Sequence, residues 1–281
     1  MKPPPFEYHA PRDTGAALRT LAEIRDSGGA GGKVLAGGQS LIPMLNMRLA
    51  APGHLVDINR VAGLGGVARA AGGVRVGALA RHAEVERAGA HPLLTRALKL
   101  VAHPVIRNRG TVVGSLVHAD PAAELPAVLA VLGGSVRVAR WEPGGAVERD
   151  VPAAGFFLGP MESAVGPGEL AVSAYFPDLG EGAGCAFTEV SRRHGDYALA
   201  GVCAVAGPGL ARVACIGVGH VPVVVDVSGL APDWAAAARA VREACEPDDD
   251  VHATAAYRRH LVGVLAGRAL REAAREAGDG A

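Results

Sequence analysis

The stretch LAGGQSL, residues 35–41, carries the strongest local information about the fold of this 281-residue chain. It follows a brief apolar run typical of a strand and precedes a run with the apolar spacing of a helix. Gly37 and Gly38 leave the backbone bare and free to adopt positive φ, and Ser40 is a good N-cap for the helix. Successive amides at such a turn can bind an anion, but the same pattern also occurs where a strand is simply connected to a helix. The stretch alone leaves both interpretations open.

The residues around this stretch predict a small α/β layer. Strands are expected at 6–9, 33–35 and 54–58. A helix that Asp13 can cap is expected to end at the pair Gly28-Gly29. Strands and helices that alternate in this way are typical of an α/β layer.

The middle of the chain contains a second glycine-containing segment. A long loop is expected at 106–115, where Thr111 and Ser115 offer hydroxyls and Gly114 offers bare backbone. Two such loops could hold a diphosphate between them, although neither matches the glycine patterns of Rossmann or P-loop nucleotide sites. The elements predicted around the loop are strands at 74–79, 135–140 and 169–177 and helices at 81–88, 93–102 and 122–132.

The carboxyl-terminal part of the chain has a different pattern, and the glycine-containing segment 180–182 predicts a linker before it. Strand candidates come first and helices follow, which predicts an α+β domain with helices on one face of an antiparallel sheet. The predicted strands are 185–192, 202–206, 211–218 and 221–227, and the predicted helices are 234–245 and 252–277.

The charge balance excludes binding to a polyanion through bulk charge. Lys and Arg total 28 and Asp and Glu total 28, whereas nucleic-acid binding needs a basic excess. At 49% hydrophobic residues the chain is too apolar for intrinsic disorder, yet it has no apolar run of the roughly 18–20 residues that a membrane span requires. The amino-terminal sequence shows no secretory signal, so we expect a cytoplasmic protein that binds neither nucleic acid nor membrane.

Other polar side chains give weaker indications of chemistry. The four cysteines lack the spacing of zinc or iron–sulfur ligands, which predicts buried thiols. Any redox chemistry would therefore need a cofactor that is held without cysteine. His118, Asp120 and Glu124 could bind a metal or a sugar hydroxyl, but one imidazole and two carboxylates without a fixed helical register disfavour a metal. Glu124 is also expected simply because acidic residues are favourable at the start of a helix. We therefore predict neither a metal site nor a catalytic acid or base.

Several motifs occur in an order and spacing that resemble a known family. They are LAGGQSLIP (35–43), RNRGTVVGSL (107–116), HADPAAELP (118–126), GPME (159–162), EVSRR (189–193), DYA (196–198) and YRRHL (257–261). Together they resemble the FAD-binding medium subunit of molybdenum hydroxylases, the family of aerobic carbon monoxide dehydrogenase and xanthine dehydrogenase. The resemblance covers nearly the whole chain.

This resemblance implies an α+β fold in which two α/β lobes form an FAD-binding unit similar to the vanillyl-alcohol-oxidase type, followed by a C-terminal α+β domain. We accordingly expect domains at 1–58, 59–178 and 183–281. Amides of the two glycine loops would hold the FAD diphosphate, Glu124 and Asp120 would lie on its ribose and adenine side, and Tyr197 would lie near the flavin ring. The residues expected to bind FAD are Leu35, Ala36, Gly37, Gly38, Gln39, Ser40, Leu41, Thr111, Gly114, Ser115, Asp120, Glu124 and Tyr197.

One position departs from the family pattern. Val113 stands where the second loop of the family usually has its first glycine. A β-branched residue with positive φ would be a strained outlier. Because the flanking motif is intact, we expect φ at Val113 to be negative.

The resemblance also implies a function. The chain would be an oxidoreductase subunit that passes electrons from the [2Fe–2S] clusters of a small partner subunit through FAD to an external acceptor. A large molybdopterin-binding partner would oxidise the substrate, in a heterotrimer or its dimer. Two alternatives remain: a self-sufficient FAD-dependent reductase or oxidase of the same fold, and a flavin-free scaffold that uses the same lobes for assembly.

Overall fold

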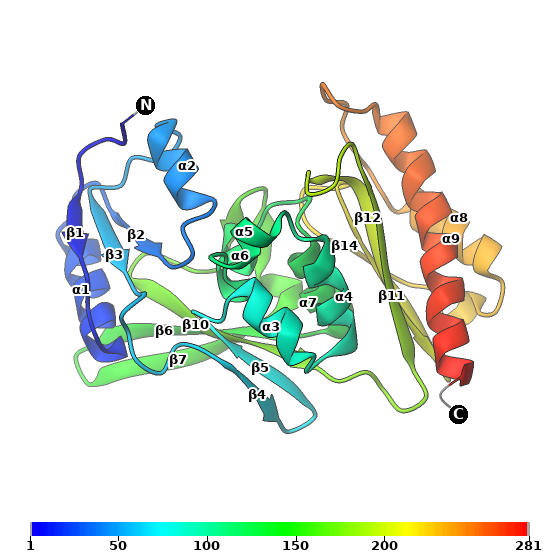
Figure 1. The fold of residues 1–281 in the computed structure, drawn as a ribbon, viewed down its shortest axis with the longest axis horizontal. Helices are drawn as coiled ribbons and strands as arrows, with labels where there is room; N and C mark the ends of the chain where they lie inside the picture. The colour runs from blue at the N-terminus through cyan, green and yellow to red at the C-terminus, as the bar shows by residue number, and fades with distance from the viewer. Residues whose placement is uncertain (1, 280–281) are drawn as a thin grey trace.

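The amino-terminal segments form a three-stranded parallel sheet in the computed structural model, which describes residues 2–279 (Figure 1). Its elements are β1 (Glu7–His9), α1 (Thr14–Asp26), β2 (Gly32–Leu35), α2 (Leu41–Asn46) and β3 (His54–Asp57). The strand order is β1–β3–β2, and α1 packs against the sheet with its apolar residues buried. This layer confirms the α/β pattern predicted on both sides of the glycine turn.

The two predicted helix caps of this layer have different outcomes. Asp13 caps α1 as predicted, because its carboxylate accepts a hydrogen bond from the amide of Ala16 at 2.7 Å. Ser40 directly precedes α2, but its backbone is already helical, with φ −92° and ψ −46°, and its hydroxyl makes no capping bond. The predicted cap at Ser40 is therefore wrong, since a capping side chain needs an extended backbone to reach the amides ahead of it.

An antiparallel five-stranded sheet lies below the helices of the middle region in Figure 1. Its strands, in spatial order, are β4 (Val67–Ala70), β5 (Gly73–Gly77), β10 (Glu169–Pro177), β6 (Ser135–Glu142) and β7 (Gly145–Pro152). The sequence predicts the three inner strands, whose apolar residues are buried, but neither β4 nor β7. Both of these lie at the edges of the sheet, where six of the eight side chains of β7 and two of the four side chains of β4 are exposed, and neither strand has a buried alternating pattern to detect.

Five helices follow one another between β5 and β6, and two of them replace a predicted loop. They are α3 (His82–Ala88), α4 (Pro92–Leu100), α5 (Pro104–Arg107), α6 (Val112–His118) and α7 (Glu124–Leu132). The single long loop predicted at 106–115 is wrong, because this segment leaves α5, makes a turn and enters α6. Thr111 is the physical reason: its backbone is extended and its hydroxyl accepts a hydrogen bond from the amide of Gly114 at 3.1 Å, which caps α6.

Val113 lies in the first turn of α6, and its buried side chain is only 2% exposed. Its φ is not among the positive values found for non-glycine residues in the described part of the chain, so the expected negative φ is confirmed. The next residue, Gly114, has a steric role, because a Cβ there would lie 2.5 Å from the Thr111 hydroxyl that caps the helix.

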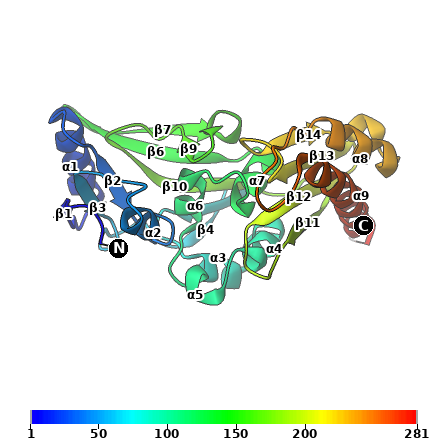
Figure 2. The same cartoon turned by 90° about the horizontal axis from the view of Figure 1, so that it is seen from above.

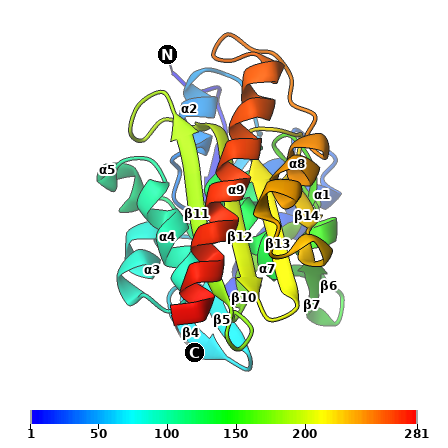
Figure 3. The same cartoon turned by 90° about the vertical axis from the view of Figure 1, so that its right-hand side faces the viewer.

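The carboxyl-terminal strands form a four-stranded antiparallel sheet that has helices on both faces. Its elements are β11 (Gly184–Ser191), β12 (Ala198–Gly207), β13 (Leu210–Ile216), β14 (Val223–Asp226), α8 (Trp234–Glu243) and α9 (Ala255–Asp279). As predicted, α8 and α9 cover one face (Figure 3), while α4 and α7 of the middle region pack on the other, so that α7 lies between the two large sheets (Figure 2). Nearly every residue of β12 is consequently buried. A short hairpin, β8 (Phe157–Gly159) with β9 (Glu162–Ser163), completes the strands described.

Two apolar cores hold these layers together. The larger extends from α1 through the five-stranded sheet to α7, and the smaller lies between the four-stranded sheet and the helices α8 and α9. All four cysteines are free and buried in these cores, as the sequence predicts. Within residues 2–279, no helix combines the length and the apolar character that crossing a bilayer requires. The division into domains at 1–58, 59–178 and 183–281 stays a prediction.

Candidate functional site

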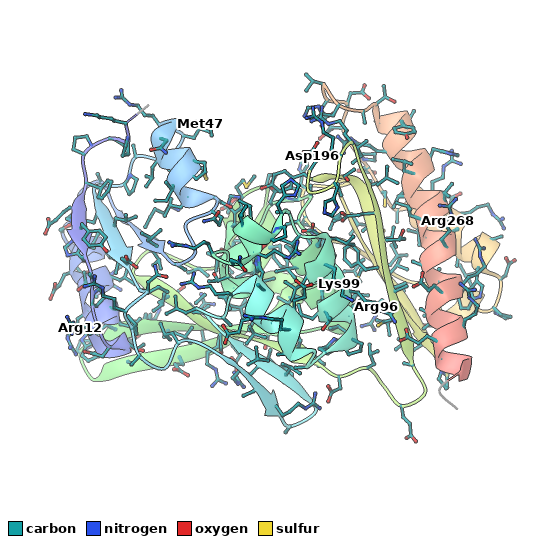
Figure 4. All side chains as sticks on the ribbon, viewed as in Figure 1. Arg12, Met47, Arg96, Lys99, Asp196 and Arg268 are labelled. Atoms are coloured by element: carbon teal, nitrogen blue, oxygen red, sulfur yellow. The ribbon has the colours of Figure 1, made fainter. Side chains whose placement is uncertain are left out.

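A cavity of about 510 Å³ lies where the three sheets and their connecting segments meet. Two of the segments that line it, α2 and the loop that carries Asp196 between β11 and β12, rise on either side of α5 and α6 (Figure 4). Leu35 is the exception among the predicted residues, because it lines a neighbouring cavity of about 420 Å³ instead. The predicted residues that line the main cavity are Ala36, Gly37, Gly38, Gln39, Ser40, Leu41, Thr111, Gly114, Ser115, Asp120, Glu124 and Tyr197.

The two glycine loops touch each other through their backbones at one edge of this cavity. A Cβ built on Gly37 would lie 2.6 Å from the carbonyl oxygen of Arg109 and 2.8 Å from Cα of Gly110. Real Cβ atoms do not approach backbone atoms this closely, so the contact requires a residue without a side chain. Segments that are far apart in the sequence are thereby brought to one place.

The first loop presents a row of backbone amides that have no acceptor. Within residues 2–279, no hydrogen bond is donated by the amides of residues 37–41, and the first amide of this region to be paired is that of Ile42, which donates to Gly38. The Ser40 hydroxyl likewise makes no capping hydrogen bond. Unpaired amides at a glycine turn form a concave donor surface that suits an anion such as a phosphate.

Asn59 and Arg81 brace the two loops, and sequence reasoning missed both. The Asn59 amide group donates to the carbonyl of Ala36 at 2.8 Å, while one guanidinium nitrogen of Arg81 donates to Asn59 Oδ1 at 2.6 Å. The other terminal nitrogen of Arg81 donates to the carbonyl of Arg109 at 2.5 Å. Asp57 orients Asn59 by accepting a hydrogen bond from its backbone amide at 2.8 Å. The Arg81 guanidinium group thus links the two loops, because it bonds the second loop directly and the first loop through Asn59.

The opposite part of the cavity is acidic and partly desolvated. Burial, reinforced by the nearby charge of Asp120, raises the pKa of Glu124 to about 7. Burial and then the charge of Glu124 raise the pKa of Glu189, on β11, to about 8. Asp120 accepts a hydrogen bond from the amide of Ala122 at 2.9 Å, which fixes its carboxylate beside the helix start. A group that offers hydroxyl donors would satisfy the Glu124 carboxylate better than the apolar surroundings do.

Tyr197 and His82 add two further features to the cavity wall. Tyr197 is 62% exposed, so its ring lies at the rim of the cavity and faces solvent. His82, which the sequence analysis did not single out, is only 5% exposed, and neither ring nitrogen has a hydrogen-bond partner within the described residues. Burial lowers the pKa of His82 to about 4, so the ring is neutral at physiological pH.

Glu124 gives the protein a pH dependence that can be tested by substitution. Because the folded-state pKa lies above the ordinary 4.5, the contribution of Glu124 to stability is complete below that pH and is lost as the pH rises through about 7. In the cofactor-free protein, the free energy of unfolding should fall between about pH 5 and pH 8, and in Glu124→Gln this fall should be smaller. Urea unfolding across this range measures it, with the exposed Glu181→Gln as the control. Parallel pH profiles for the two variants would show that Glu124 is not desolvated.

A comparison with protein families matches residues 4–179 to the family described as the FAD binding domain in molybdopterin dehydrogenase. The chain belongs to this family. Residues 233–273 match a second family, the carbon monoxide dehydrogenase flavoprotein C-terminal domain. The resemblance seen in the sequence, the α+β fold class, the FAD cofactor and the oxidoreductase class are thereby confirmed.

Curated relatives and solved structures agree with this membership over nearly the full length. The 6-hydroxypseudooxynicotine dehydrogenase complex subunit alpha of Paenarthrobacter nicotinovorans is 38% identical, with 97% of this chain and 96% of that protein covered. The carbon monoxide dehydrogenase medium chain of Hydrogenophaga pseudoflava is 35% identical, with 97% and 98% covered. The crystal structure of the H. pseudoflava carbon monoxide dehydrogenase that lacks the Mo-pyranopterin moiety superimposes with a TM-score of 0.88 at 34% identity, covering 98% and 99% of the two chains.

The residues present fit FAD. The acceptor-free amides of the first loop suit a diphosphate, and the loops approach each other too closely for side chains to fill the space. The desolvated carboxyl of Glu124 supplies a polar partner along the wall. A volume of about 510 Å³ is within the range of cofactor sites.

Proposed function

We propose that this chain is the FAD-carrying electron-transfer subunit of a molybdenum hydroxylase complex. In such a complex, this chain would hold the FAD that links the [2Fe–2S] clusters of a small partner subunit to an external acceptor, while a large molybdopterin-binding subunit would oxidise the substrate. The names of the relatives, a medium chain and a subunit of a dehydrogenase complex, support this role. Bound FAD supplies the ability to accept and donate electrons singly or in pairs.

The observation that carries the proposal is the backbone contact of the two glycine loops beside a row of free amides. We assign the diphosphate of FAD to the amides of residues 37–41, with the second loop, including Thr111, Gly114 and Ser115, closing over it. A diphosphate held by amides stays anchored without a mobile charged side chain, so the position of the cofactor is set by the rigid backbone. Leu35 would act only as support, because it does not line the main cavity.

The remaining site residues have distinct tasks in this proposal. Glu124, helped by Asp120, accepts hydrogen bonds from ribose hydroxyls, which also relieves the cost of its burial. Tyr197, at the rim, would lie beside the flavin ring of a bound FAD. His82, buried and neutral, packs inside the wall. No acid or base of the chain is needed for electron transfer.

The donor groups of the chain support the assignment of the iron–sulfur clusters to a partner. A cluster takes four thiolates, whereas the four cysteines are buried and divided between the two apolar cores. Buried, reduced thiols also fit the cytoplasm as the location of the complex. We propose a heterotrimer of large, medium and small subunits, or its dimer.

The test is a comparison of the isolated chain with the assembled complex. The isolated chain should purify with FAD and show the flavin absorption band, but a substrate of the complex should not bleach that band until both partners are added. Bleaching by substrate in the isolated chain would instead establish a self-sufficient flavoenzyme. A colourless chain that assembles normally with its partners would establish a scaffold.

Tyr197→Ala provides the internal control for this test. The variant should keep FAD, because the diphosphate contacts are elsewhere, while the flavin spectrum and reduction potential change. If neither the spectrum nor the potential moves, Tyr197 is not at the ring.

A further inference from the structure

We propose that Glu7, His9 and His54 form a binding site for a divalent transition-metal ion, with Zn²⁺ as the ion that fits the donors. The three residues lie on the three-stranded sheet, outside the FAD cavity. Among residues 2–279, they are the group of three or more potential ligands whose donor atoms all lie within 4.8 Å of one another.

The register of the sheet brings these side chains to one face. Glu7 and His9 are two residues apart on β1, so their side chains point to the same side. Glu7 and His54 are direct partners in the parallel pairing of β1 with β3, which places His54 beside them. The cluster is thus held by backbone pairing and not by a flexible loop.

The distances between the donor atoms match those around a bound ion. His9 Nε2 lies 3.1 Å from His54 Nδ1, and carboxylate oxygens of Glu7 lie 3.7 Å from the first of these nitrogens and 3.5 Å from the second. Ligands that bind tetrahedral zinc at about 2.0–2.2 Å are about 3.4 Å from one another. The two imidazole nitrogens and the Glu7 carboxylate, which approaches His9 through Oε1 and His54 through Oε2, therefore already have nearly the spacing of ligands around one ion.

The chemistry of the donors selects the type of ion. Two imidazole nitrogens and one carboxylate form a set that suits Zn²⁺ and related ions, whereas Mg²⁺ and Ca²⁺ prefer oxygen ligands. The side chains of His9 and His54 are 23% and 25% exposed, and that of Glu7 is 66% exposed, so an ion can reach the site and keep a water as fourth ligand. Without an ion, one of the facing nitrogens donates its proton to the other in a hydrogen bond. Metal binding would require the donor ring to change tautomer, so that its proton moves to its other ring nitrogen and both facing nitrogens can bind the ion.

Occupancy would fasten the edge strand β1 to the central strand β3. On the opposite face, Tyr8 already makes such a link by donating its hydroxyl to the Asp57 carboxylate at 2.6 Å. Asp57 in turn orients Asn59, which holds the first glycine loop. An ion that binds only the folded layer raises the free energy of unfolding. Once its concentration exceeds the dissociation constant, the increase grows with the logarithm of the ratio of concentration to dissociation constant.

The experiment uses the FAD-loaded chain without a polyhistidine tag, since a tag binds the same ions. After treatment with a chelator, the protein is titrated with ZnCl₂ by calorimetry, and thermal unfolding is recorded with and without zinc. We expect one Zn²⁺ per chain and a higher unfolding temperature with zinc. The variants His9→Ala and His54→Ala should each weaken the binding by at least about tenfold, a cost typical of damaged zinc sites. The exposed His260→Ala is the matched control and should bind zinc as the unchanged chain does.

Two further measurements keep the outcome clear if a histidine variant folds poorly. Glu7→Gln keeps the shape of the side chain and removes its charge, and should weaken zinc binding while FAD content stays constant. Co²⁺ in place of Zn²⁺ should give the strong visible absorption of a tetrahedral site, and excess Mg²⁺ should not displace it. The proposal is overturned if zinc binds Glu7→Gln and His54→Ala as tightly as the unchanged chain, or if Co²⁺ shows only a hydrated, octahedral spectrum.

Discussion

The variant Gly37→Ala should purify almost free of FAD. The added methyl group would lie 2.6 Å from the Arg109 carbonyl oxygen, so the two glycine loops must separate and the row of amides loses its geometry. Forcing one carbon into such a contact costs about 1–3 kcal/mol, which weakens FAD binding by about 5- to 150-fold. The measurement is the ratio of flavin to protein after purification, followed by FAD titration of the cofactor-free chain.

Gly29→Ala is the matched control, since a Cβ there meets only the Ser27 hydroxyl oxygen at 3.7 Å, an ordinary contact. This variant should keep its FAD. The unfolding temperatures of both cofactor-free variants show whether Gly37→Ala loses FAD because the loop is distorted or because the whole protein is destabilised. If Gly37→Ala binds FAD as tightly as Gly29→Ala does, the backbone contact between the loops has no part in the site.

Arg81→Met should also weaken FAD binding strongly, although Arg81 does not line the cavity. The variant removes the hydrogen bonds to Asn59 Oδ1 and to the Arg109 carbonyl that hold the loops in register. Hydrogen bonds from a charged donor contribute about 1.5–3 kcal/mol each, so we expect FAD affinity to fall by about tenfold or more. FAD titration of the cofactor-free variant measures this loss.

Two further variants distinguish the effect of the Arg81 hydrogen bonds from the effect of its positive charge. Arg81→Lys keeps the charge, but a single ammonium cannot reproduce the two-pronged geometry, so its FAD affinity should remain close to that of Arg81→Met. Arg69→Met removes an arginine that pairs with Asp178 at the surface, and it should leave FAD binding unchanged. Full recovery of affinity in Arg81→Lys would mean that charge, and not the fork, holds the loops.

The fold was predictable wherever burial leaves a periodic pattern. The inner strands β5, β6 and β10 show such a pattern. The edge strands do not, because β7 is mostly exposed and none of the four residues of β4 is fully buried. The turn between α5 and α6 was obscured for another reason. Thr111 and Gly114 look like loop residues, and only their mutual hydrogen bond reveals a helix start.

The sequence predicts the motifs of the site but not the residues that hold those motifs in place. The glycine loops are local signals, and the residues that the family resemblance places on FAD, apart from Leu35, line one cavity. Asn59 and Arg81 act on backbone carbonyls that lie 23 and 28 residues away, and nothing in their neighbourhood marks them for that task. The pairing of His9 with His54, 45 residues apart, likewise depends on the strand register, which local sequence does not specify.

The cavity draws its walls from three layers of the fold, and under the proposed function this arrangement sets the distance between the flavin and its electron-transfer partners. Electron tunnelling slows steeply as donor and acceptor move apart, so the proposed role would depend on how these layers stack. A substitution in the interior between α7 and the flanking sheets could thus alter turnover of the assembled enzyme while every direct contact to the coenzyme stays intact.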